Sequence, residues 1–170
     1  MISIRIRRIT PVLGTVIIAS ILLSGCLAGG AWDPKVGDFL EYSISDGVNQ
    51  GTERWSVTSV TATNFTLNIT TTVPGQPPNY WEVTMLKNQT LGYDLNHPLS
   101  GDTVTKIGTE TISTKWGERS VDHYRIAYEE PLGNPHTYDL WARDGVLMKM
   151  VDINISRLLI DTNIPQVINS

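Results

Sequence analysis

The sequence predicts an all-β domain: a single curved antiparallel sheet of about nine strands, a half-barrel or partly open barrel, preceded by an N-terminal signal helix. Three observations predict it. Short segments rich in threonine, valine, isoleucine, tryptophan and tyrosine alternate apolar with polar residues. Turn pairs such as Asp46-Gly47 and Asp144-Gly145 separate these segments. No window of twelve or more residues beyond the first 26 shows a 3.6-residue period.

The sequence of the first half of the domain predicts four longer strands and one short strand. The clearest alternation runs from Asn64 to Val73, with apolar and polar residues on opposite parities. Proline and glycine between Pro74 and Pro78 predict a loop, since proline cannot donate to a ladder. The predicted segments are 39–45, 52–61, 64–73, the strand around Trp81, Val83 and Met85, and the short piece 91–95.

The second half predicts two hairpins, 109–116 with 119–128 across Gly117-Glu118, and 137–142 with 146–155 across Asp144-Gly145. In the last of these strands the apolar parity changes near Met150, which predicts a β-bulge there, because one extra residue exchanges the two faces. Residues 158–160 extend this strand or form a final short one.

The N-terminus has the order of a secretory signal peptide. Arg5, Arg7 and Arg8 precede an apolar run from Val12 to Leu23, which small residues and Cys26 follow. This run is short for a permanent span of a bilayer core of about 30 Å. We therefore expect a signal peptide over 1–25, a lipid-attached tether over 26–36 and the β-domain over 37–170. An uncleaved anchor helix is the alternative, and it also leaves the domain outside the membrane.

Leu23-Ser24-Gly25-Cys26 resembles the lipobox of prokaryotic lipoproteins, in which the cysteine is lipidated and becomes the first residue of the mature chain. Cys26 is the only cysteine, so its lipidation leaves the mature domain without a disulfide or a free thiol. The resemblance implies an exported protein, anchored to the outer face of the cell membrane through a lipid on Cys26.

Charge excludes one class of partner. Three of the thirteen basic residues precede Cys26 and all seventeen acidic residues follow it, so the mature domain carries ten basic residues and a net charge of −7. An acidic domain without a basic cluster repels phosphate backbones, and we expect no nucleic-acid partner. Adhesion to anionic headgroups by charge is equally unfavourable, which leaves the lipid as the anchor.

No catalytic residue, metal ligand set or cofactor is predicted. His97 and His136 lie beside prolines in predicted loops, and His123 lies in mid-strand, where we expect an exposed side chain. No two histidines have the spacing that places two metal ligands on one face of an element. A hydrolase or glycan-processing enzyme would need a pocket that gathers several titratable groups.

Four Asn-X-Ser/Thr sequons are candidate glycosylation sites: Asn64, Asn68, Asn88 and Asn154. Three of them, Asn64, Asn68 and Asn154, lie on the polar parity of their strands, so one face carries glycans if the host glycosylates exported proteins. A merely solvated polar face is the alternative.

The tryptophans divide by parity. We expect Trp55, Trp81 and Trp116 in the core, Trp32 in the tether and Trp141 as the most exposed of the five. Apolar residues of two adjacent predicted strands are the candidates for a ligand-binding face: Phe65, Leu67, Ile69, Trp81 and Met85.

Three segments resemble archaeal and bacterial exported lipoproteins that share a β-domain. They are Lys35-Val36-Gly37-Asp38-Phe39-Leu40-Glu41-Tyr42-Ser43, the hairpin 108–126 and the strand pair 138–150. That group is similar to the lipoprotein-carrier superfamily, in which helices cover the apolar concave face of a half-barrel. This chain departs from the carriers because it has no obvious amphipathic helix to serve as a lid.

We therefore expect a non-enzymatic, lipid-anchored cell-envelope protein with a binding or structural role, whose partner is an unknown envelope protein. The alternative is a carrier or sensor of an apolar ligand or lipid on the concave face. A glycan-processing or other hydrolase is the third hypothesis. The threonine-rich strands and sequons are typical of an archaeal surface protein.

Overall fold

The computed structural model describes residues 32–87, 102–129 and 134–169. These residues form nine strands and one short helix, in the order β1 (Phe39–Ser45), β2 (Gln50–Val60), β3 (Asn64–Thr72), β4 (Asn79–Leu86), β5 (Thr103–Thr114), β6 (Gly117–Glu129), β7 (Pro135–Arg143), β8 (Val146–Val151), β9 (Ser156–Thr162) and α1 (Pro165–Ile168).

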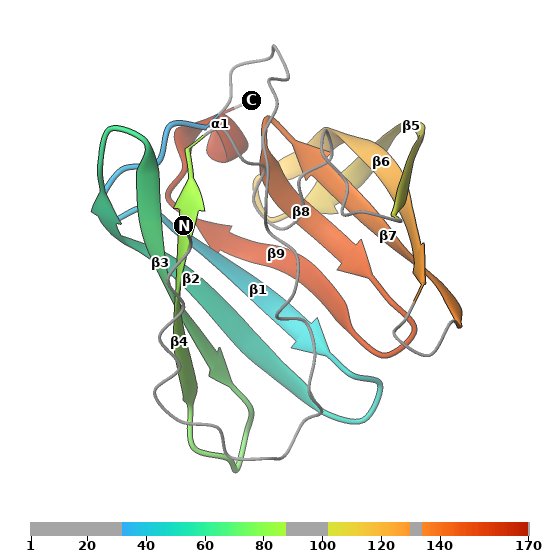
Figure 1. Cartoon of the computed structure of the whole chain (residues 1–170), viewed down its shortest axis with the longest axis horizontal. Helices are drawn as coiled ribbons and strands as arrows, with labels where there is room; N and C mark the ends of the chain where they lie inside the picture. The colour runs from blue at the N-terminus through green and yellow to red at the C-terminus, as the bar shows by residue number, and fades with distance from the viewer. Residues whose placement is uncertain (1–31, 88–101, 130–133, 170) are drawn as a thin grey trace.

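All nine strands belong to one antiparallel sheet with the order β4-β3-β2-β1-β9-β8-β7-β6-β5. Pairing of β1 with β9 joins the two halves of the chain in the middle of the sheet. Strands β4 and β5 lie at the two edges, so the sheet curves without closing into a barrel (Figure 1). The predicted all-β class, single antiparallel sheet and strand number are confirmed for the part of the chain that the structure describes.

Strand β3 shows how the sequence pattern becomes a buried face. Phe65, Leu67 and Ile69 are buried, whereas Asn68 between them is exposed. Each apolar residue pairs across the ladder with a residue of the same face of β4: Phe65 with Met85, Leu67 with Val83, and Ile69 with Trp81. Such directly opposed side chains are the unit of stabilisation in a sheet.

The predicted turn of the β5–β6 hairpin is wrong by two residues. The turn consists of Lys115 and Trp116, and Thr114 pairs with Gly117, which is the first residue of β6. Gly117 has a φ of 101°, a conformation that residues with a Cβ rarely adopt. Gly117 therefore provides the positive φ at the residue that follows the turn, and it is not one of the two central turn residues.

The predicted long strand 146–155 is also wrong. Strand β8 ends at Val151, and the amide of Asp152 donates to the carbonyl of Ile155 (2.8 Å) to close a turn before β9. This turn, rather than a bulge near Met150, accounts for the change of apolar parity. An irregularity does lie close to Met150: Trp141 pairs with Lys149 while Ala142 pairs with Leu147, and Met148 between them is unmatched.

The predicted Asp144-Gly145 turn is confirmed. Both residues have positive φ, 48° and 80°, as a two-residue hairpin of type I′ requires. Asp144 is the one non-glycine residue with positive φ in the described part of the chain.

Trp32, predicted in the tether, belongs to the core. Its side chain is 6% exposed and meets Phe65 edge to face, with ring centroids 5.6 Å apart. Its indole N–H donates to Asp38 (2.9 Å), and its backbone amide donates to the carbonyl of Asp144 (3.3 Å). The core of the domain therefore includes Trp32, which precedes the first strand.

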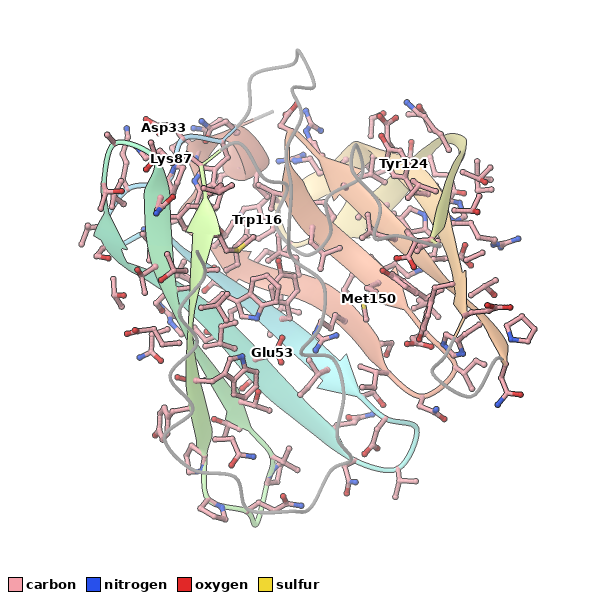
Figure 2. The ribbon with its side chains drawn as sticks, in the orientation of Figure 1. Asp33, Glu53, Lys87, Trp116, Tyr124 and Met150 are labelled. Atoms are coloured by element: carbon pink, nitrogen blue, oxygen red, sulfur yellow. The ribbon has the colours of Figure 1, made fainter. Side chains whose placement is uncertain are left out.

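These contacts define one end of the sheet, here called the Trp32 end. The amide of Phe39 donates to Asn163 (2.8 Å), and Lys87 pairs with Asp33 (3.4 Å). Both Lys87 and Asp33 are labelled in Figure 2. The Trp32 end consists of residues 32–38, 61–63, 144–145 and 163–168.

The opposite end, here called the hairpin end, carries the β1–β2 and β8–β9 turns. These turns are neighbours, since Ser45 pairs with Gln50 on one side and with Ser156 on the other. The hairpin end consists of residues 46–49, 73–78 and 152–155.

Candidate functional site

The predicted ligand-face residues lie together on one face of β3 and β4. Phe65, Leu67, Ile69 and Met85 are buried, and Trp81 is half-buried and packs against them. They form part of the hydrophobic core of the domain.

A buried ion pair lies on the same face of the sheet, close to its centre. Glu53 of β2 is 3% exposed, and Arg157 of β9 reaches across β1 to it with Nε 2.9 Å from Oε1. The indole of Trp55 donates to Oε1 (2.8 Å), and the hydroxyl of Thr71 donates to Oε2 (3.3 Å). We call these residues and Tyr42 the Glu53 cluster (Figure 2).

Tyr42 lies opposite Glu53 in the β1–β2 ladder and is fully buried. Its ring lies 5.2 Å from that of Trp55, and its hydroxyl donates to the carbonyl of Leu147 (3.0 Å). Burial raises the pKa of Tyr42 far above its ordinary value, and the nearby Glu53 carboxylate raises it further. The hydroxyl is therefore a hydrogen-bond donor at all ordinary pH values, and it ties β1 to β8.

A second polar group, here called the His123 cluster, lies on the other face of β5–β8. His123 Nδ1 lies 2.6 Å from Glu110 Oε1, and Nε2 lies 3.1 Å from Asp139 Oδ1. The imidazole stacks on Trp141 at 4.3 Å, and Lys149 Nζ lies 4.3 Å from the centroid of the same indole.

Two predictions are wrong at this cluster. His123 and Trp141 were both expected to be exposed, yet both are buried. They pair directly across β6 and β7, and so cover each other. A cross-strand pair of flat rings removes both from water, an effect that one strand alone cannot reveal.

Electrostatics hold the His123 cluster together. Hydrogen bonds from Trp141 (3.0 Å to Oε2) and from His123 hold the pKa of Glu110 below its ordinary value. Desolvation raises the pKa of Asp139, but hydrogen bonds from Arg125 and His123 outweigh it, and the net shift is downward.

The polar side chains of both clusters bond to their neighbours in the sheet. In the His123 cluster each ring nitrogen faces a carboxylate oxygen, and Arg125 binds both oxygens of Asp139 (2.9 and 3.1 Å). Within the described ranges, no group of three or more histidine, cysteine, aspartate or glutamate residues is placed to hold a metal ion. The contacts of His123 with Glu110 and Asp139 join β5, β6 and β7 through their side chains.

A shallow hollow of about 240 Å³ lies beside the Asp144-Gly145 turn. Arg143 lines the hollow, and its Nε lies 3.5 Å from Asp144 Oδ2. This nitrogen is buried and makes no hydrogen bond. The other lining residues are Ser120, Val121, Asp122 and Ala142.

The remaining predicted positions are scattered. Asn68 and Asn154 are exposed and Asn64 is half-buried, but Asn154 lies in the β8–β9 turn rather than in a strand. His136 lies in β7, not in a loop, with Nε2 2.6 Å from Asp152. Cys26, Asn88, His97 and the short strand 91–95 lie outside the described residues.

Sequence reasoning missed both clusters, although a signal for one was present. Glu53 has the parity of Trp55 and Val57, so a charge stands on the apolar side of its strand. Such a charge needs a partner. No sequence signal pairs it with Arg157, 104 residues away.

Within the part of the chain that the structure describes, no helix is both long and apolar enough to cross a bilayer. No protein-family model, curated protein or solved structure matches this chain.

Proposed function

We propose that this chain is a lipid-anchored cell-envelope protein with a non-enzymatic binding or structural role at the outer face of the membrane. The observation that carries the proposal is the position of Trp32. Trp32 lies six residues after Cys26, the predicted first residue of the mature chain, and its side chain is already buried against Phe65. The whole nine-strand sheet is built from residues beyond the predicted processing site.

The polar clusters favour a non-enzymatic role. A catalytic acid or base must be able to exchange a proton with a substrate. Glu53 accepts bonds from three neighbouring side chains while nearly excluded from water, and both nitrogens of His123 are engaged. These contacts support a structural role for both groups.

The curved open sheet agrees with the half-barrel that the resemblance to exported lipoproteins implies. A carrier of an apolar ligand would use the face of Phe65 and Leu67 as an open groove. Both side chains are 1% exposed. Their burial favours a stable body that presents its ends and polar surface to a partner, and for this reason we place the carrier second.

Membrane fractionation of a Cys26→Ser variant tests the proposal. We expect the wild-type protein in the membrane fraction and the variant shed into the medium, because serine cannot carry a thioether-linked lipid. Ala28→Ser is the matched control, since it introduces the same residue two positions away and should stay with the membrane. Retention of Cys26→Ser on the membrane, or wild-type protein in the cytosol, would contradict the proposal.

A further inference from the structure

We infer that the Trp32 end of the sheet rests against the headgroup layer of the membrane, while the hairpin end points outward. This inference rests on the proposed lipid anchor at Cys26 and adds the orientation of the body. Its partner is the lipid surface itself.

The short link between the lipid and the fold limits the reach of the anchor. Five residues, 27–31, separate Cys26 from Trp32. A fully extended chain spans at most about 3.5 Å per residue, so the six steps reach about 20 Å. Trp32 is therefore held within that distance of the lipidated sulfur.

Trp32 is a rigid point of attachment. Its indole is buried against Phe65 and bonded to Asp38, and its backbone amide is bonded to Asp144. The first contact joins it to β3 and the last joins it to the β7–β8 turn, so both halves of the sheet share the attachment. A force on the link is therefore transmitted through Trp32 to the whole Trp32 end.

The strands set the distance to the other end. Strand β2 has 11 residues, and its ten steps of about 3.4 Å make it roughly 34 Å long. This length exceeds the reach of the link. When the strands point away from the membrane surface, the hairpin end is far from the lipid anchor.

Charge disfavours the alternative in which the sheet lies flat. The polar face of β1–β3 would then meet the headgroups, and it carries Glu41 and Arg54 as an ion pair and Asn68 as an exposed sequon. The mature domain has a net charge of −7, so a broad contact with an anionic surface is repulsive. Contact through the small Trp32 end avoids most of this repulsion.

The Trp32 end has side chains suited to a headgroup layer. Val36 is 66% exposed, Lys35 beside it is exposed, and Asp33 is paired with Lys87. At the hairpin end, Val48 and Ile153 are 89% and 75% exposed at the tips of two adjacent turns. The outward hairpin end is thus the surface left for other envelope components.

Two single-thiol variants test the orientation, because Cys26 is the only native cysteine and is blocked when lipidated. Val36→Cys and Val48→Cys replace exposed side chains, so neither should disturb folding. Each full mature protein is purified from membranes, labelled with a fluorophore and bound to preformed vesicles of phosphatidylcholine and anionic phosphatidylglycerol that contain a lipid with a headgroup-attached quencher. We expect at least threefold stronger quenching of the label at position 36. Equal quenching, or stronger quenching at position 48, would overturn the inference.

Failure of the anchor is a separate observation in the same experiment. Without a lipid, the protein does not float with the vesicles and position 26 takes up the label, whereas a wrong orientation leaves flotation intact. A 20-residue Gly/Ser insertion after Ala28 is the second test. It should preserve flotation and reduce the difference in quenching by at least half. An undiminished difference would overturn the short link as its cause.

Discussion

Glu53 and Arg157, 104 positions apart in the chain, form an ion pair across β1 with Nε and Oε1 2.9 Å apart. The pair joins β2 of the N-terminal half to β9 of the C-terminal half on the apolar face of the sheet. The ion pair lies beside the β1–β9 pairing, which joins the two halves of the chain into one sheet.

Arg157→Met should destabilise the domain by about 3 kcal/mol, because a nearly buried Glu53 carboxylate would lose its countercharge. The free energy of unfolding in urea measures the effect. Arg125→Met is the matched control, since it removes an exposed guanidinium from a partly exposed aspartate and should cost less than about 1 kcal/mol.

A double variant separates the charge from the packing. Glu53→Leu with Arg157→Met should recover most of the lost stability, because apolar residues of similar size often replace a buried ion pair without cost. A double variant as unstable as Arg157→Met alone would contradict the account of the pair.

Trp32→Ala should cost about 3–5 kcal/mol, the range for removal of a large aromatic side chain from a core. Trp32→Phe should cost less, since it keeps most of the contact with Phe65 and loses mainly the hydrogen bond to Asp38. Urea unfolding of the two variants checks the order. A negligible effect of Trp32→Ala would show that the folded body begins after this residue.

Prediction from sequence succeeded where one strand sufficed. The alternation of Phe65, Leu67 and Ile69 identified a buried face, and Asp144-Gly145 identified a turn, because both signals are local. Prediction failed where burial depends on a neighbouring strand. His123 and Trp141 each look exposed alone and become buried only as a stacked pair.

The stability of the domain should fall as the pH drops below about 4.5. The pKa of Glu110 is held below its ordinary value of 4.5 by hydrogen bonds from Trp141 and His123. A carboxyl group whose pKa is lower in the folded state stabilises the fold above its unfolded pKa and loses that contribution as the pH falls through the folded value. The pKa of Asp139 is also held below its ordinary value of 3.8, so the loss of stability continues at lower pH.

Urea unfolding midpoints between pH 3 and 7 check this sign. Glu110→Gln should flatten the curve near pH 4, because glutamine does not titrate. Glu129→Gln is the control, since this exposed glutamate lies at the end of β6, away from the His123 cluster. Equal pH dependence of the wild type and Glu110→Gln would contradict the role of the cluster.

Gly51→Ala should destabilise the domain by about 1–3 kcal/mol through overpacking. A Cβ on Gly51 would lie well inside van der Waals distance of the backbone carbonyl oxygen of Thr72. Gly108→Ala is the matched control, because a Cβ there meets no atom within 4 Å, and it should change stability by less than about 0.5 kcal/mol. Thermal unfolding compares the two, and equal effects would contradict the predicted clash.

The Glu53 cluster and the attachment of Trp32 lay beyond sequence reasoning for a common reason. Both depend on which distant segments the topology brings together, and the β1–β9 pairing that does so has no local sequence signature. Trp32 lies in a stretch with the composition of a linker, where glycine and alanine predominate. Its contacts with Phe65 and Asp144 form only when the sheet brings these distant residues together.

We propose that a lipid on Cys26 joins this β-domain to the membrane. Mass spectrometry of the N-terminal fragment of the protein, purified from membranes of cells that express it, tests the claim most directly. We predict a fragment that begins at Cys26 and carries the added mass of lipid chains on that residue. A fragment that begins at Met1, or an unmodified thiol at Cys26, would contradict the account.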